Sequence, residues 1–182
     1  MNSKAYRLVV LSLYVAMALI LSYVESLIPL PLPIPGAKIG LPNIITLVSL
    51  LTLGWPLTLL VVVARVLLAG FLFGGGFSIV YSLAGGLLSL LVMSLLLYFF
   101  KEKISLVLVS IFGAITHNLG QVVVAAIVVQ TTSLLLYFLF LMLLAIPTGI
   151  FIGISARELM RLLNKTTIFR KLNLPQKKTG HD

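Results

Sequence analysis

The chain has 182 residues, of which 60% are hydrophobic and only 9% are charged, whereas an ordinary soluble domain carries about 25% charged residues. This composition excludes a soluble globular protein. The absence of cysteine excludes a disulfide framework, a thiolate metal site and a cysteine nucleophile. A net charge of +9 is compatible with nucleic-acid binding, but the basic residues gather beside apolar segments, which is typical of the cytoplasmic loops of membrane proteins.

The sequence predicts one all-α membrane domain over residues 1–165, a six-helix transmembrane bundle. Its longest stretch without a charged residue runs from 104 to 156, and about 20 apolar residues in a helix cross a bilayer. Breaking the apolar runs at proline, glycine and charged clusters predicts helices over residues 6–24, 41–53, 56–72, 78–100, 104–130 and 134–163. The second helix is too short to cross without tilt or help from its neighbours.

The distribution of Lys and Arg predicts the orientation in the cell membrane. Six crossings with a cytoplasmic N-terminus place Lys101, Lys103 and a basic tail over residues 166–182 in the cytoplasm, and leave Glu25 and Lys38 outside. The alternative is a signal peptide cleaved near Ala16–Ala18, which would leave five spans and move the basic C-terminal residues outside. We expect the six-span arrangement, with both termini cytoplasmic.

Residues 25–40 are the least regular part of the membrane domain. Prolines at 29, 31, 33 and 35 forbid a continuous helix and favour extended backbone. The segment is either a stiff outer connector or a lid over an outward-facing cavity, and the sequence leaves both open.

The sequence lacks the motifs that several classes of enzyme require. No phosphate-binding P-loop motif and no HExxH zinc motif occurs. The only acids are Glu25, Glu102, Glu158 and Asp182, and none is adjacent to another, so the chain has no paired carboxylates for Mg²⁺ or for acid–base catalysis. We therefore expect a protein without metal or cofactor that is not an enzyme.

Arg65 is the clearest candidate for function because it lies midway along a predicted span. A charge within a span costs several kcal/mol and normally faces the bundle interior with a partner. The outer half of the chain offers one acid, Glu25. Arg65 must pair with Glu25, with backbone carbonyls, or with an anion that enters from outside.

A second polar cluster lies on the fifth predicted helix. His117 and Gln121 are four residues apart, which places them on one helix face, and Asn118 is adjacent. These side chains either form hydrogen bonds between helices or line a pocket. Asn43, Lys38 and Tyr81 are predicted at the same level, and with Glu25 and Arg65 they complete the candidate substrate-binding residues.

Four segments carry a resemblance to a known family: the Pro-rich run from Glu25 to Asn43, Arg65–Gly70, Phe73–Gly76 and Tyr81–Ser89. They resemble the Gx transporter family, which is often labelled heptaprenyl diphosphate synthase component I. That family is similar to the substrate-binding S components of energy-coupling factor (ECF) transporters.

The resemblance implies a six-helix protein that captures a small molecule from outside and works with a membrane T component and two cytoplasmic ATPases. A helix 1 motif that contacts the T component would correspond to Ser12 and Ala16, with serine replacing the first alanine. The gating loop would correspond to residues 28–38. Contacts from that loop and from helices 4 to 6 would include Tyr81, His117, Asn118 and Gln121, whereas Arg65 falls outside them.

The synthase label conflicts with the residues, because prenyl-diphosphate condensation needs acid-rich metal sites. An isoprenoid or quinone precursor remains a reasonable cargo, since Arg65 and Lys38 suit an anionic head group. Three alternatives stay open: a stand-alone secondary carrier, a membrane subunit that scaffolds a prenyl synthase, and a membrane enzyme acting through His117 and Arg65.

Overall fold

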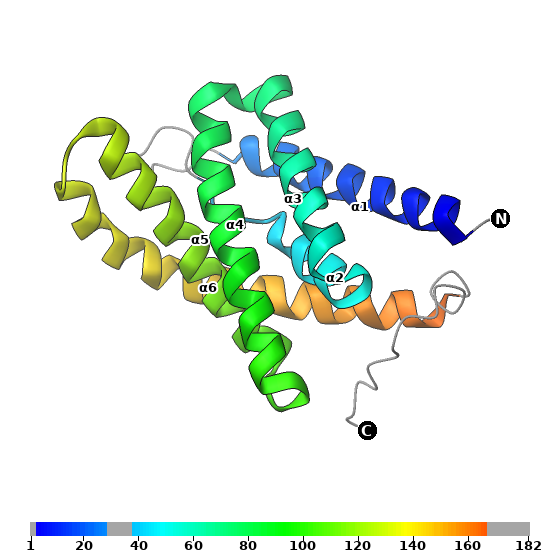
Figure 1. The fold of residues 1–182 in the computed structure, drawn as a ribbon. Coiled ribbons are helices and arrows are strands. Elements are labelled where there is room, and N and C mark those ends of the chain that lie inside the picture. Colours follow the sequence, from blue (N-terminus) through cyan, green and yellow to red (C-terminus); the bar gives the residue numbers. More distant parts are fainter. Residues whose placement is uncertain (1–2, 29–37, 167–182) are drawn as a thin grey trace.

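The computed structural model of the protein describes residues 3–28 and 38–166, and these contain no strand. Figure 1 shows helices crossing one another around a short central helix. In chain order the elements are α1 (Ser3–Ser26), α2 (Asn43–Leu53), α3 (Trp55–Ala69), the π-helix η1 (Gly70–Gly74), α4 (Gly75–Phe100), the 3₁₀-helix η2 (Lys101–Lys103), α5 (Leu106–Val129) and α6 (Ser133–Lys165).

The helices begin and end within a few residues of the predicted positions. The main difference lies at residues 73–77, which the predicted helices over 56–72 and 78–100 leave as a connection. Instead α3 continues as η1 through Gly74, and α4 begins at Gly75. The chain reverses there because Gly75 has a φ of +75°, a conformation that glycine adopts without steric penalty. Figure 1 shows α3 and α4 joined at the top of the view as an antiparallel pair.

Within the described residues, four helical stretches are long and apolar enough to cross a membrane: Ala5–Ser26, Trp55–Phe100, Leu106–Val129 and Leu136–Lys165. This count differs from the six predicted spans for a geometric reason. α2 has only 11 residues, and α3, η1 and α4 follow one another without a break. The protein is therefore a membrane-type α-helical bundle.

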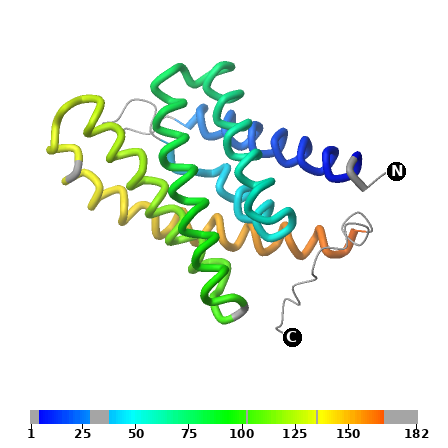
Figure 2. Tube along the Cα trace, in the orientation of Figure 1, coloured from blue at the N-terminus to red at the C-terminus, as the bar shows by residue number. Residues whose placement is uncertain are grey.

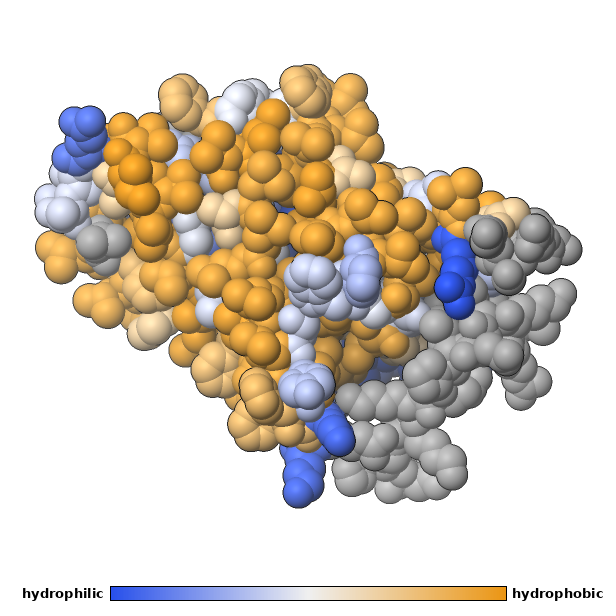
Figure 3. Space-filling view, in the orientation of Figure 1, coloured by the Kyte–Doolittle hydropathy of each residue, from blue (hydrophilic) through white to orange (hydrophobic). Residues whose placement is uncertain are grey.

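The molecular surface has the character expected of a protein embedded in lipid. Many large apolar side chains are exposed, among them Phe71 at 80% and Leu136 at 74%. Figure 3 shows apolar residues over most of the visible face, with the most hydrophilic residues at its edges. A contiguous apolar surface of this extent is incompatible with water and matches a lipid environment.

α5 packs closely between α4 and α6, and glycines make this packing possible. A Cβ atom built at Gly149 or Gly153 on α6 would lie 2.5 Å from the backbone of α5. Small residues spaced four apart lie on one helix face and let two helix backbones approach closely.

α2 lies at the centre of the fold and contacts all five other α-helices. Figure 2 shows it between α1, α3 and α6. Nine of its residues are buried, and the hydroxyls of Tyr14 on α1 and Thr52 on α2 form a hydrogen bond of 2.9 Å. The N-terminal end of α2 carries Asn43 and follows the segment Lys38–Leu41, so this central helix positions the polar residues described next.

Candidate binding site

Buried polar side chains gather around the segment Lys38–Leu41, where it passes between α1 and α5. They come from four helices, and each is at most 3% exposed. The members are Glu25 on α1, Asn43 on α2, Arg65 on α3, and His117 and Gln121 on α5. We call these five residues the interior cluster.

Glu25 fixes the start of α2. Its Oε1 accepts hydrogen bonds from the backbone N–H groups of Gly40 and Leu41, the latter at 3.1 Å. Gly40 has a φ of +95°, and a Cβ there would lie 2.9 Å from Asn43 Nδ2 and 3.2 Å from the His117 ring. Glycine is therefore required at position 40 by both backbone conformation and space.

Gln121 holds the backbone of Lys38 with both ends of its amide. Its Oε1 accepts from the Lys38 N–H at 2.9 Å, and its Nε2 donates to the Lys38 carbonyl at 3.0 Å. This pairing determines which end of the amide is the nitrogen. The remaining proton on Nε2 points to His117 Nε2, with which it forms a short hydrogen bond.

The donor at Gln121 also determines the state of His117. Because the amide nitrogen can only donate, His117 Nε2 must accept, and the imidazole is neutral with its proton on Nδ1. Nδ1 lies against the Gly85 backbone without a hydrogen bond of good geometry. Both ring nitrogens thus face the protein, so His117 supports the Lys38 segment.

Lys38 lies outside the membrane-spanning helices, and its ammonium lies 5.9 Å from the centre of the Phe73 ring. Burial lowers the pKa of the Lys38 ammonium from its ordinary value, and the positive charge of Arg65 acts in the same direction, while the negative charge of Glu25 opposes both. Lys38 therefore lies within electrostatic range of both charged members of the interior cluster.

Arg65 has the fewest partners of any buried charge in the described residues. Its Nη1 contacts the Ser22 hydroxyl at 3.4 Å, while Nε and Nη2 have no hydrogen-bond partner. Glu25 attracts Arg65 electrostatically, but no ion pair within 4 Å joins the two side chains in the part of the chain described. Of the three partner types expected for Arg65, neither a direct Glu25 pair nor a backbone carbonyl is present there.

Further polar atoms in this region also lack partners. Both side-chain atoms of Asn43, Glu25 Oε2 and Ser78 Oγ are buried without a hydrogen bond. An unsatisfied buried polar group costs about 1–3 kcal/mol. Buried polar atoms without a partner are rare in folded proteins, and a bound ligand is one way to satisfy them.

Other predicted site residues lie elsewhere. Tyr81 packs in an apolar cluster with Val122, Ala125 and Leu141, and Asn118 Nδ2 donates to the Leu141 carbonyl at 3.1 Å. No hydrogen bond or ion pair within the described part of the chain joins the side chain of Tyr81 or Asn118 to the interior cluster. The prolines at 29–35, most of the predicted gating loop, and residues 167–182 of the predicted tail lie outside the described residues.

Ser12 and Ala16 are exposed on α1, whereas Ala18 and Ser22 face the interior. Ser22 and the backbone of Gly40 and Leu41 are further members of the site that were not predicted from the sequence. The position of Ser22 could have been inferred from the sequence, because it precedes Glu25 by three residues and therefore lies on the same helix face. The described residues contain no group of three or more His, Cys, Asp or Glu side chains that could hold a metal ion.

A depression of about 440 Å³ lies on the outer face of α4 and α5 and is separate from the interior cluster. Its lining is apolar, with Leu87, Leu91 and Val123 among the residues. Acyl chains of the bilayer fit such a surface without any specific recognition.

Comparison with known proteins identifies the family. The model of one family, described as heptaprenyl diphosphate synthase component I, matches residues 14–159, well over half of the chain. The chain belongs to this family. The match confirms the resemblance seen in the sequence. No curated protein and no solved structure matches the chain.

Proposed function

We propose that this protein is the substrate-binding S component of an ECF transporter and captures a small molecule with an anionic head group, such as an isoprenoid or quinone precursor. Arg65 is the main support for this proposal, because its side chain is buried, with 2% of the residue exposed, and two of its guanidinium nitrogens have no hydrogen-bond partner. An isolated charge in the bundle interior is expensive and marks a functional site. A bound anion would satisfy it.

The proposed topology has six membrane crossings. The short helix α2 would be one of them, because the helices packed around it would hold it within the membrane. In Figure 1 the first turns of α1 and the last turns of α6 lie at the right, whereas the α3–α4 connection lies at the top and the α5–α6 connection at the left. Lys103 in the α4–α5 connection and Arg157 near the end of α6 would then face the cytoplasm. The interior cluster would open towards the cell exterior, in the cell membrane.

The proposed partners are a T component and two ATPase subunits. Ser12 and Ala16 support a contact on α1, because both are exposed and are not used for packing within the chain. The protein itself would supply no energy and perform no chemical step, since its four acids form no metal-binding pair. Uptake would require a conformational change driven by the partners.

A second candidate is a membrane subunit associated with prenyl diphosphate or menaquinone synthesis. The family description favours it. Such a subunit would need a partner enzyme and no small-molecule site of its own. A stand-alone secondary carrier is less well supported, because Glu25 is the only acid of the outer half and accepts two backbone N–H groups.

The deciding experiment is purification in mild detergent, followed by mass spectrometry of bound small molecules and associated proteins. We expect a bound anion that is retained without ATP, together with a T component and ATPases. Protein reconstituted alone should bind the compound but not accumulate it in vesicles. Co-purification of a prenyl synthase with no bound small molecule would support the second candidate instead.

A further inference from the structure

Resting on the proposed function, we infer that the cargo head group is a single carboxylate, bound side-on by Arg65. The proposed function allows any anionic head group, whereas a carboxylate is planar and has one negative charge. It excludes phosphate and diphosphate head groups, and it rests on the geometry of the guanidinium and on the charges around it.

The geometry concerns which nitrogens of Arg65 have partners. A guanidinium offers an end-on edge formed by its two Nη atoms and a side-on edge formed by Nε and Nη2. The contact with Ser22 uses Nη1, and the unpartnered atoms are Nε and Nη2. The complete side-on edge is therefore unsatisfied. Its two parallel N–H groups match the two oxygens of a carboxylate.

The charge balance concerns three groups that interact electrostatically. In their ordinary ionic forms Arg65 and Lys38 are cations and Glu25 is an anion, and the three act electrostatically on one another. These forms together have one positive charge in excess. Two backbone N–H donors on Oε1 and two nearby cations favour the ionised form of Glu25, whereas its burial opposes that form. In a region of low dielectric, one added negative charge is favoured and a second would be unbalanced.

Neighbouring groups agree with this charge count. His117 adds no charge, because its Nε2 accepts from Gln121. Asn43 lies against Gly40, whose N–H is held by Glu25. Its unpartnered Nδ2 is a neutral donor for a head-group oxygen, and its Oδ1 can accept from a hydroxyl. No third cation among the described residues joins the interior cluster to balance a dianion.

The test uses three probes that share one ring and differ in head group: benzoate, phenyl phosphate and benzyl alcohol. Their charges at pH 7.5 are close to −1, −2 and 0, since the second pKa of a phosphate ester is about 6. Equilibrium dialysis measures their binding to the full chain in nanodiscs of phosphatidylcholine, which contain no anionic lipid. We expect wild-type protein to bind benzoate at least about tenfold more tightly than either other probe.

Two variants separate geometry from charge. Arg65→Lys keeps the positive charge but removes the side-on edge, and should weaken benzoate binding by about tenfold or more. Glu25→Gln keeps an oxygen for Gly40 and Leu41 but raises the excess charge to two, and should shift the preference towards phenyl phosphate by about tenfold. Lys103→Gln, which removes an exposed cation at the opposite end of α4, is the matched control and should change nothing.

The outcomes distinguish this inference from the proposed function. Tighter binding of phenyl phosphate to wild-type protein, or an unchanged preference in Glu25→Gln, would overturn the carboxylate assignment and leave the transport role standing. Equal binding of benzoate to wild type and Arg65→Lys would remove Arg65 from the site. Selective benzoate binding by a protein that purifies without ATPases would support the inference and contradict the transporter role.

Discussion

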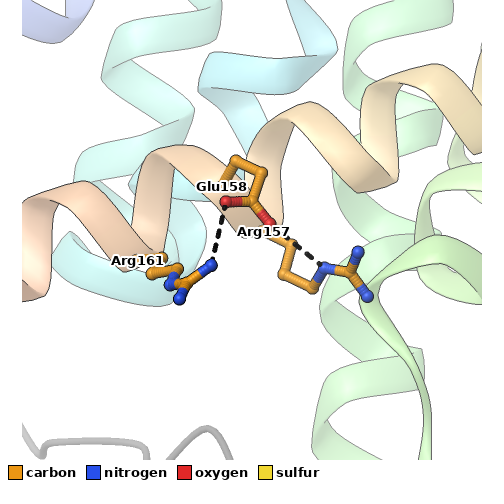
Figure 4. A network of polar contacts seen from close by, with 3 residues as sticks. All are labelled: Arg157, Glu158 and Arg161. Carbon is orange, nitrogen blue, oxygen red and sulfur yellow. Dashed lines mark ion pairs between the residues drawn. The ribbon is translucent and has the colours of Figure 1, made fainter.

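The charged residues near the end of α6 and those of the interior cluster differ in how they pair. Near the end of α6, Glu158 lies 3.8 Å from Arg157 and 3.7 Å from Arg161, and all three side chains are at least half exposed (Figure 4). In the interior cluster, Arg65 and Glu25 are buried and are not in direct contact. The exposed charges form ion pairs, which contribute little to stability because solvent screens them. The buried charges form no direct pair, although an unpaired charge costs most in the interior.

In this protein an ion pair therefore does not indicate that a charged residue has a function. Exposed pairs form because flexible side chains of opposite charge meet at little cost. Buried charges persist only where the surrounding structure holds them for another purpose. We therefore expect substitutions in the interior cluster to have the largest effects and substitutions near the end of α6 the smallest.

The largest effect is expected for Glu25→Ala. It removes the acceptor for two backbone N–H groups and leaves Arg65 and Lys38 without the negative charge that attracts them. Breaking a buried charge interaction from one side typically costs about 3–5 kcal/mol. The free energy of unfolding in mixed micelles should fall by about this amount. Glu25→Gln, which keeps the acceptor, should lose less, and equal losses would show that the backbone contacts do not contribute.

The next effect is expected for Gln121→Leu. It leaves the Lys38 N–H, the Lys38 carbonyl and His117 Nε2 without partners, and should cost about 2–3 kcal/mol. Asn118→Leu is the matched control on the same helix, since it loses one hydrogen bond to α6 and should cost about 1 kcal/mol or less. A larger loss for Asn118→Leu would show that the α5–α6 contact, and not the Lys38 segment, limits stability.

A smaller effect concerns pH. Burial lowers the pKa of Lys38 in the folded protein below its ordinary value of 10.5, so between these two values the unfolded chain binds more protons than the folded one. Stability therefore rises with pH across that window. Lys38→Met should remove this part of the pH dependence. Unfolding curves of both proteins between pH 7 and 10.5 measure it, and identical slopes would contradict the assignment.

The smallest effect is expected for Glu158→Ala. It removes two ion pairs, but both are long and exposed, and pairs of this kind contribute about 0–1 kcal/mol. The free energy of unfolding should change by no more than about 0.5 kcal/mol. A loss as large as that of Gln121→Leu would break the contrast between the two regions.

Much of the fold could be predicted because apolar runs and helix-breaking residues act locally. The start of α3 follows from Pro56, which is tolerated in the first helical turn. The junction at Gly74–Gly76 could not be predicted, because glycine permits both a flexible turn and an ordered reversal. The contacts of neighbouring helices decide between them.

The site was predicted unevenly for a similar reason. Arg65, Glu25, His117 and Gln121 stand out because polar side chains are rare in apolar helices. Tyr81 and Asn118 share that signal but lie in the contact region of α4, α5 and α6. Helical spacing shows which residues share a face, but the face that turns inward depends on how the helices pack.

The sequence by itself determined that this protein belongs in a bilayer, where its helices lie, and that Arg65 needs a partner. Those properties follow from composition and local spacing, which act residue by residue. Only the tertiary structure decided which partner each polar group finds. Glu25 holds the start of α2, Gln121 holds Lys38, and the side-on edge of Arg65 has no partner. The residues in these contacts are 15 to 83 positions apart in the sequence, so the contacts depend on the packing of the whole bundle.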